Sequence, residues 1–316
     1  MDGPIEQCVL RQIPAGTALH AQAMHMAMSL ELPKTGDSPA IPVANLLSSA
    51  ATGAISIDLL IGAFHGDRLT SACLAVVSPG AAAMVILPTD LAESGRFAAT
   101  VAILRELQRR CQRASIALLE VLVDSGVTGQ SRALENAGFR RLTELIYLRR
   151  GCESPHLPDA RRDDLTWIQY MPDREALFAE ALEHTYVDSK DCPELTGIRP
   201  ATEVLTGHRS TALFDPTMWW VVQLGGESVG ILLLNRLSSG SAVEVEYIGV
   251  VPAWRGLGVS DALLHRAFIL ARRACVECMA LAVDARNQPA RRWYARWGFE
   301  QIGSKDAWIA SPSEKF

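Results

Sequence analysis

Apolar residues along the chain form short continuous runs and longer stretches with helical spacing. Strand-like apolar runs occur at 116–123, 140–148, 279–283 and 300–309. Amphipathic stretches with helical spacing occur at 96–113 and 259–274. The uncharged stretch Leu69–Pro88 is long enough to cross a bilayer at ~20 residues, but Ser78-Pro79-Gly80 interrupts it. We therefore expect two buried strands joined by a turn there, and no membrane segment.

The same pattern occurs twice. Val123-Asp124 is followed after 14 residues by Gly138-Phe139, and Val283-Asp284 is followed after 14 residues by Gly298-Phe299. An apolar run that ends in proline precedes the two aspartates by 36 and 32 residues. The intervals hold matching helical patterns, so the chain reads as two copies of one unit.

Each copy reads as strand, helices, three antiparallel-type strands, helix, strand, helix and strand. Early hairpins and late βαβ crossovers predict an α/β fold, a mixed sheet with helices on both faces. We expect two domains, 1–150 and 165–316, joined by a linker at Gly151–Asp164 that contains Pro155 and Pro158. The length of 316 residues agrees with two domains of ~100–200 residues each.

Composition distinguishes the two halves. Residues 1–150 carry 13 basic and 13 acidic side chains, whereas 151–316 carry 17 and 22, so the second half accounts for the net charge of −5. The seven tryptophans are also in the second half, at 167, 219, 220, 254, 293, 297 and 308. This charge balance lacks the excess of Lys and Arg that sequence-independent nucleic-acid binding requires.

The cysteines indicate the compartment. Seven of them form no even set of pairs, which fits a reducing cytoplasm. Cys275 and Cys278 form a lone C-x-x-C without a second pair or a nearby histidine, and we expect them to be small buried residues and not metal ligands.

A glycine-containing loop follows an apolar strand pattern in the second copy. The strand pattern ends at Pro252, Gly256 and Gly258 follow, and a helix pattern begins near Val259. Backbone N–H groups of such a loop and the positive end of the helix dipole form a phosphate site. The loop is not a Walker A loop, because Val259-Ser260 and not Lys-Ser/Thr follows the last glycine. It is not a Rossmann loop either, because Asp261 stands where the third glycine would be.

The segment Val-x-Pro-x-x-Arg-Gly-x-Gly resembles the pyrophosphate-binding segment of the GNAT N-acyltransferase superfamily. The core pattern Arg/Gln-x-x-Gly-x-Gly/Ala maps onto Arg255, Gly256, Leu257, Gly258, Val259 and Ser260, with Ser in place of the last Gly or Ala. The resemblance implies that amides of this loop hold the pyrophosphate of acetyl-CoA as co-substrate.

A second segment agrees with the same family. The sequence from Asn287 to Phe299 resembles its Asn-x-x-Ala-x-x-x-Tyr-x-x-x-Gly-Phe segment, with the tyrosine at Tyr294. In the family the asparagine contacts the pantetheine or phosphate arm and the tyrosine protonates the departing thiolate. The alternative for Tyr294 is a packing aromatic. The two-copy layout is also similar to that of the mycothiol synthases, which implies architecture and no substrate.

Two acidic residues are candidates for the base. Glu244 and Glu246 are two apart on a strand, so they point to one face, and Glu244 lies where many family members place a catalytic carboxylate. We expect Glu244 to be the base and Glu246 a helper or acceptor contact; a solvated acidic strand face is the alternative. The resemblance further implies that Ile248, Gly249 and Val250 bind the acyl-CoA, with the N–H of Gly249 or Val250 as oxyanion donor. Direct transfer without an acyl-enzyme is expected.

The first copy lacks every one of these groups. Gly80 is at the Glu244 position, Leu91 at the Arg255 position, Val127 at the Asn287 position and Leu134 at the Tyr294 position. We therefore predict that residues 1–150 are a non-catalytic copy.

The acceptor is expected at the first helices of the second copy, from Glu180 to Glu194. Five acids against one lysine there would attract a cationic amine, with Tyr186 and Asp191 as contacts; a solvated helix end is the alternative. The expected function is transfer of an acetyl group to a small amine or a peptide N-terminus, without a metal. The competing hypothesis is an acyl-CoA-binding sensor or scaffold without turnover. Nucleic-acid modification is disfavoured by the acidic second half.

Overall fold

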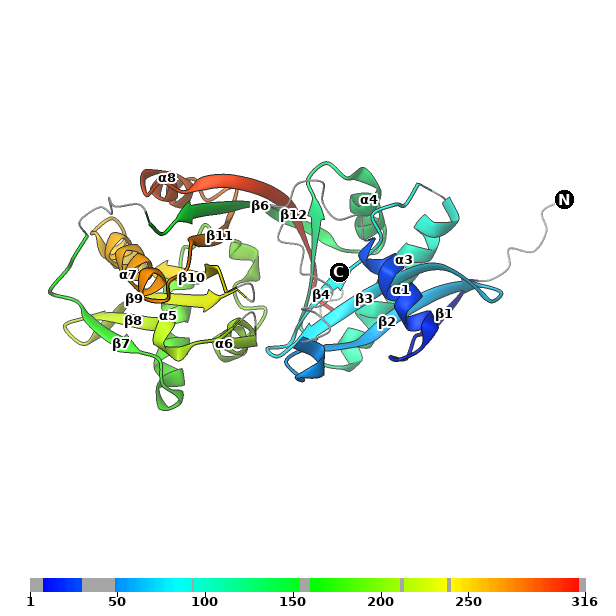
Figure 1. The fold of residues 1–316 in the computed structure, drawn as a ribbon, viewed down its shortest axis with the longest axis horizontal. Coiled ribbons are helices and arrows are strands. Elements are labelled where there is room, and N and C mark those ends of the chain that lie inside the picture. Colours follow the sequence, from blue (N-terminus) through cyan, green and yellow to red (C-terminus); the bar gives the residue numbers. More distant parts are fainter. Residues whose placement is uncertain are drawn as a thin grey trace. The chain divides into compact units, whose positions relative to one another are not determined.

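The computed structural model describes residues 8–29, 49–92, 94–153, 160–210, 213–237 and 240–312. The chain divides into two compact units, here called unit 1 (residues 1–143 with 305–316) and unit 2 (residues 144–304) (Figure 1). Both combine helices with a mixed sheet, so the predicted α/β fold class is confirmed.

Strands of unit 1 lie in the order β1-β2-β3-β4-β5-β12, with β4 and β5 parallel and the other neighbours antiparallel. The bounds are β1 Val9–Gln12, α1 Ala18–Met28, β2 Ser56–His65, β3 Arg68–Ser78, β4 Ala82–Ile86, α3 Ser94–Arg113, β5 Leu118–Asp124, α4 Thr128–Asn136 and β12 Glu300–Ala310. The stretch Leu69–Pro88 thus forms two strands, as predicted.

Helices cover both faces of this sheet. Leu60 packs in a cluster with Ala23 and Met24 of α1, whereas the next residue, Ile61, packs in a cluster with Ile103 and Leu107 of α3. Successive residues of a strand point to opposite faces, so α1 and α3 lie on opposite sides.

Unit 2 repeats the arrangement, in the order β6-β11-β10-β9-β8-β7, and only β10 and β11 are parallel. The bounds are β6 Arg140–Gly151, β7 Thr166–Gln169, α5 Glu175–Tyr186, α6 Ala201–Ser210, β8 Trp219–Leu224, β9 Glu227–Arg236, β10 Ala242–Val250, α7 Val259–Arg273, β11 Cys278–Asp284 and α8 Gln288–Arg296. Short 3-10 turns occur at Pro172–Arg174, Pro193–Leu195, Pro216–Met218 and Pro252–Trp254.

The last strand of each repeat lies in the other unit. β6 is the last strand of the first repeat, but Leu145–Gly151 pair with β11 of unit 2. β12 is the last strand of the second repeat, but Lys305–Ala310 pair with β5 of unit 1. The predicted ranges 1–150 and 165–316 therefore describe repeats of the sequence, whereas the compact units exchange their last strands; residues 154–159 of the predicted linker lie outside the described residues.

The strand exchange places one tryptophan of the second half of the sequence, Trp308, in unit 1. Trp308 is buried in the core of unit 1, because β12 crosses into it. Trp219 is fully buried in unit 2, where its indole N–H donates to Asn235 (3.1 Å). Trp167 and Trp220 flank the guanidinium of Arg266, at 5.2 and 4.2 Å. Trp167, Trp219 and Trp220 thus have structural roles in unit 2.

Within the described residues, no helix is both long and apolar enough to cross a membrane.

Candidate active site

A β-bulge shapes the centre of β10. The pairing of β10 with β9 shifts register between Val245 and Tyr247, so Glu246 is the extra residue. Glu246 Oε2 lies 3.3 Å from Nδ1 of His208, and the next residue, Tyr247, hydrogen-bonds through its hydroxyl to Thr185 Oγ1 (2.9 Å). Both side chains therefore face α5 and α6, which two successive residues of a regular strand could not do.

β10 and β11 separate beyond Glu244. Their parallel pairing covers Ala242–Glu244 against Cys278–Ala280 and then stops, although β10 continues to Val250. The predicted acyl-CoA contacts Ile248, Gly249 and Val250 lie in this separated part. A Cβ at Gly249 would be 2.7 Å from Oγ1 of Thr185 and from the ring of Tyr247, so only glycine fits there.

The pKa of Glu244 is raised to about 7. Burial of the carboxyl group is the main cause, and the negative charge of Glu246 adds to it. A carboxyl group with this pKa is partly ionised at neutral pH, which suits a general base.

The glycine loop after β10 has the expected form. Gly256 and Gly258 have φ of 77° and 81°, a region open to glycine, and Gly258 caps the start of α7. Val259 is buried and Ser260 is half-buried, so the first turn of α7 lies against the core. The first N–H groups of α7 lack partners within the helix and can receive an anion.

The guanidinium of Arg255, in the same loop, is engaged by backbone carbonyl groups of β10 and of the end of α5. Its guanidinium donates to the carbonyl oxygens of Val250 (3.0 Å), Asp188 (3.0 Å), Thr185 (3.1 Å) and Val187 (2.7 Å). The arginine of the motif thus holds the end of α5 against the glycine loop.

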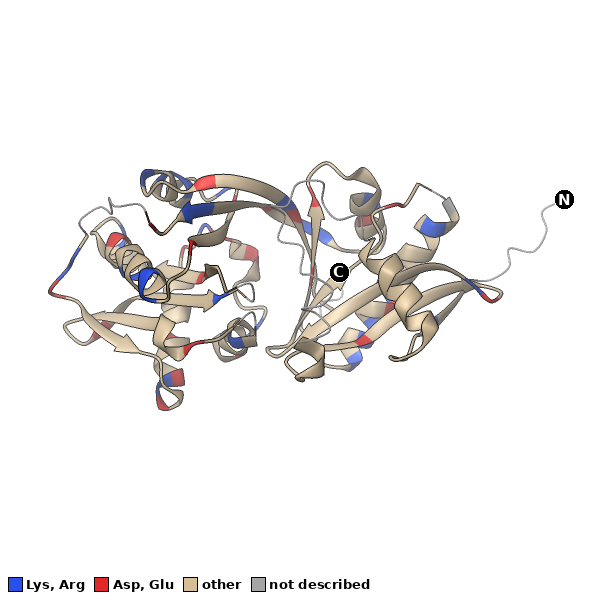
Figure 2. Cartoon of the chain, in the orientation of Figure 1, with Lys and Arg blue, Asp and Glu red and all other residues tan. Residues whose placement is uncertain are grey.

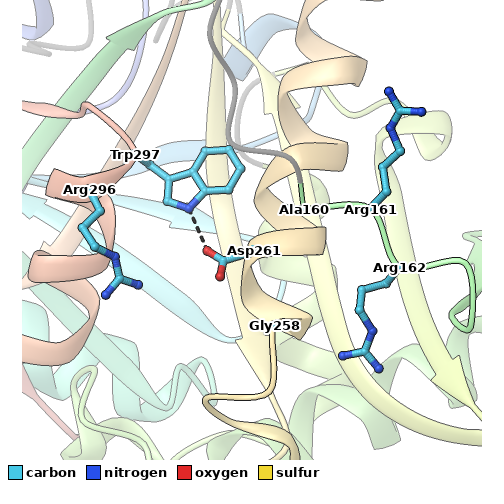
Figure 3. Close-up of a pocket in the computed structure, with 7 residues that line it drawn as sticks. All are labelled: Ala160, Arg161, Arg162, Gly258, Asp261, Arg296 and Trp297. Carbon is cyan, nitrogen blue, oxygen red and sulfur yellow. Dashed lines mark hydrogen bonds between the residues drawn. The ribbon is translucent and has the colours of Figure 1, made fainter.

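A pocket of about 470 Å³ adjoins the start of α7. Seven residues line it, namely Ala160, Arg161, Arg162, Gly258, Asp261, Arg296 and Trp297 (Figure 3). The carboxylate of Asp261 is held by the indole N–H groups of Trp293 (2.7 Å) and Trp297 (2.8 Å). Three arginines line the pocket, namely Arg161, Arg162 and Arg296, the last of them from helix α8, which carries no acidic residue (Figure 2). The pocket is therefore suited to an anionic ligand.

Tyr294 lies buried on α8, with ring centres 4.7 Å from Trp293 and 5.5 Å from Phe299. Burial raises its pKa well above the usual range, and the charge of Asp191 acts in the same direction. The hydroxyl therefore keeps its proton at neutral pH, as an acid must.

Asn287 begins α8 and connects it to the acceptor loop. Its Oδ1 accepts from the N–H of Ala290 (3.2 Å), which caps the helix, and its Nδ2 donates to Asp191 (3.5 Å). In this structure Asn287 is therefore a cap and a contact to Asp191.

The two residues predicted to contact the acceptor are Tyr186 and Asp191. Tyr186 lies beside Tyr247 of β10, and Asp191 lies beside the end of β11 and the start of α8. Tyr186 packs edge-on against Tyr247, with ring centres 5.5 Å apart. Asp191 is exposed as a residue, but its carboxylate turns inward and accepts from the N–H of Asp284 (2.9 Å). Burial of this carboxyl group raises its pKa, and its hydrogen bonds oppose that effect.

Part of the acidic segment is neutralised. Arg286 donates to Glu194 at 2.6 and 2.9 Å and to the fully buried Asp284 at 2.7 Å. Of the five acids of the segment from Glu180 to Glu194, Glu194 is therefore neutralised by an ion pair with Arg286. Across the described part of the chain, no group of three or more His, Cys, Asp or Glu side chains is arranged to hold a metal ion.

Several residues of this site were not identified from the sequence. They are His208, Arg286, Asp261, Arg161, Arg162 and Arg296. The pair Arg161-Arg162 after a proline-containing segment is a weak signal for an anion site, and the other contacts join residues far apart in the chain.

Comparison with protein families gives a match to the acetyltransferase (GNAT) family over residues 172–299. The chain is 32% identical to a mycothiol acetyltransferase of Beutenbergia cavernae over 92 residues, or 28% of this chain and 30% of that protein. It is 26% identical to an uncharacterized N-acetyltransferase of Methanocaldococcus jannaschii over 100 residues, or 30% of this chain and 44% of that protein. The chain thus spans less than half the length of these relatives.

Solved structures extend the likeness to both units. A GCN5-related N-acetyltransferase from Sphaerobacter thermophilus has a TM-score of 0.64 at 18% identity, covering 98% of this chain and 97% of that one. A tandem GNAT protein from the clavulanic acid biosynthesis pathway has a TM-score of 0.57 at 13% identity, covering 98% and 100%. At these identities the likeness concerns the fold. The chain thus shares its fold with tandem GNAT proteins, and its residues 172–299 match the acetyltransferase (GNAT) family.

Proposed function

We propose that the chain is an acetyl-CoA-dependent N-acetyltransferase that transfers an acetyl group directly to a primary amine, with its active site in unit 2. The observation that carries the proposal is the separation of β10 from β11, which begins at Glu244 and extends toward the loop at 256–258. An extended thioester lying there would place its phosphates at the start of α7 and its acyl end near Glu244.

The residues at the start of α7 fit coenzyme A. The free N–H groups of the first turn, with Gly256 and Gly258 leaving room for a close approach, suit a pyrophosphate. The arginine-lined pocket beside them suits a further phosphate, because guanidinium groups bind phosphate oxygens in pairs. Bound there, acetyl-CoA would supply an activated acyl group.

Three groups of the chain would then act on the reaction. Glu244 takes a proton from the ammonium form of the acceptor, directly or through water, so that the amine nitrogen can bond to the acyl carbon. The N–H of Gly249 or Val250 stabilises the negative charge on the carbonyl oxygen. Tyr294 gives its proton to the sulfur as the carbon–sulfur bond breaks, and the second proton that the nitrogen loses on becoming an amide restores the Tyr294 hydroxyl, directly or through water.

Glu246 is assigned a supporting role. Its charge raises the pKa of Glu244, so Glu246→Gln should lower that pKa and move the acid limb of the kcat/KM profile to lower pH, by up to about 1 unit. A pH–rate profile of both proteins checks this. If the variant instead loses the acid limb altogether, Glu246 is the base.

Unit 1 is proposed to be non-catalytic, and its own structure supports this. β4 and β5 separate after Met84 and Glu120, as β10 and β11 do in unit 2. Here the buried Gln130, from α4, donates to the carbonyl oxygens of Leu87 and Pro88, both at 3.2 Å. The side-chain amide of Gln130 thus binds the backbone just after β4. In unit 2 the corresponding place is the separation between β10 and β11.

Calorimetric titration with acetyl-CoA should therefore give one site per chain. Gly258→Asp, which adds a side chain and a negative charge at the start of α7, should abolish binding. A stoichiometry of two, or binding that persists in Gly258→Asp, would place a site in unit 1.

A non-catalytic acyl-CoA sensor is the second candidate. A screen of small amines and peptide N-termini, with released thiol as the readout, separates the two. Thiol release with any acceptor supports the enzyme, and CoA binding without release across the panel supports the sensor.

The seven free cysteines support a reducing compartment such as the cytoplasm.

A further inference from the structure

Arg162 connects the segment before β7 to the glycine loop. Its Nη1 donates to the carbonyl oxygen of Leu257 at 2.5 Å. The other edge of the guanidinium is bound in a two-point contact by Asp164, from Nε to Oδ1 (2.8 Å) and from Nη2 to Oδ2 (2.5 Å). Neither Arg162 nor Asp164 belongs to residues 172–299 that match the family.

These contacts orient the guanidinium rigidly. A two-point pair with a carboxylate fixes the plane of an arginine, because its donors have a fixed geometry. The hydrogen bonds from Arg162 hold the pKa of Asp164 below its usual range. With the plane fixed, Nη1 is directed at the carbonyl oxygen of Leu257, a residue whose side chain is exposed.

The carbonyl of Leu257 matters for the orientation of the loop. It lies between the two glycines with positive φ, where the backbone has little intrinsic preference. With this carbonyl held toward Arg162, the peptide N–H of Gly258 on the same plane points the opposite way. Two N–H bonds of the guanidinium are not used in these contacts, and Arg162 lines the anion pocket (Figure 3).

We propose that Arg162, oriented by Asp164, is a positioning residue that holds the glycine loop in the form that binds the phosphates of acyl-CoA. The inference rests on the proposed function, because it assumes that the loop binds acyl-CoA. It adds a contact from outside the family domain on which the affinity of the loop depends.

Arg162→Ala should weaken acetyl-CoA binding about tenfold or more, because it removes a charged hydrogen bond to the loop. The dissociation constant is measured by calorimetry, and kcat at saturating acetyl-CoA should stay within about twofold, so that the loss falls on KM. Arg162→Lys keeps the charge but cannot bind Asp164 and Leu257 in the same fixed geometry, and it should restore little of the affinity.

The Asp164→Asn variant distinguishes a positioning role of Arg162 from a role as a positive charge alone. If Arg162 acted only as a positive charge, removing the negative charge of Asp164 would tighten binding of an anion. If Asp164 orients Arg162, the same variant should weaken binding, by about threefold or more. The asparagine is close in shape, so the variant is informative even if Arg162→Ala folds poorly.

Arg161→Ala is the matched control. Arg161 lines the same pocket, but its side chain extends away from the Gly258 end of α7 (Figure 3). Its loss should weaken binding less than that of Arg162, and high salt should reduce the difference from the wild type. Unchanged affinity in Arg162→Ala, or tighter binding in Asp164→Asn, overturns the inference while the wild type still binds acetyl-CoA. If the wild type binds none, the proposed function fails and the inference with it.

Discussion

Replacing Tyr294 by Phe should lower kcat about a hundredfold, the usual loss when a positioned acid is removed. A tyrosine keeps its proton at neutral pH at its usual pKa of ~10, and burial raises the pKa of Tyr294 further, so its role would be to give that proton to the departing sulfur. The ring contacts with Trp293 and Phe299 remain in the variant, so acetyl-CoA affinity should stay nearly unchanged. Steady-state kinetics together with calorimetry measure both quantities.

Tyr247→Phe provides the matched control. Tyr247 is another inward-facing tyrosine of the same centre, but its hydroxyl is already bonded to Thr185. Its loss should cost about 1 kcal/mol of folding stability and only a small part of kcat. If Tyr294→Phe turns over at the wild-type rate, Tyr294 is a packing aromatic and another group protonates the sulfur.

Replacing Glu244 by Gln should have an effect of similar size that depends on pH. A base must be ionised, and the pKa of Glu244 is about 7, so the wild-type rate should rise with pH through about 7 and then level off. Glu244→Gln removes the ionising group and should lose this limb, with kcat/KM reduced about a hundredfold near pH 7. The loss should shrink as pH approaches the pKa of the acceptor amine, where the amine loses its proton unaided.

Glu246→Gln serves as the comparison, because it keeps Glu244 and should keep a limb displaced to lower pH. A Glu244→Gln profile that retains the limb near pH 7 would show that Glu244 is not the group that titrates. Transfer through bulk water or a base on another element would then have to be considered.

Much of the fold could be predicted because it rests on local pattern. The helix predicted at 259–274 is Val259–Arg273, and the strand predicted at 300–309 is Glu300–Ala310. The hydrophobic period that defines such elements is a property of neighbouring residues. The positive φ at Gly256 and Gly258 is likewise local, and the sequence pointed to it through glycine itself.

The candidate site was predicted less completely, because its contacts join distant residues. Arg255 stays a predicted residue of the phosphate-binding loop, but its hydrogen bonds to the end of α5, about 70 residues earlier in the chain, could not be predicted. Glu246 was expected on a regular strand, but a bulge set by pairing with β9 turns it to His208. Gln130 was not noticed at all, since its significance depends on the separation of two strands.

The sequence by itself determined the two-copy plan, the presence of the two family-like segments in the second copy alone and the glycine loop at the start of α7. Those features depend on residue type and short spacing, which are present in the chain before it folds. Only the tertiary structure decided which sheet receives β6 and β12, because both repeats carry an equivalent last strand and either sheet could pair with it. It also decided that Arg162, paired with Asp164, reaches the loop at Leu257, since that contact exists only once the segment before β7 and the start of α7 are packed in one unit.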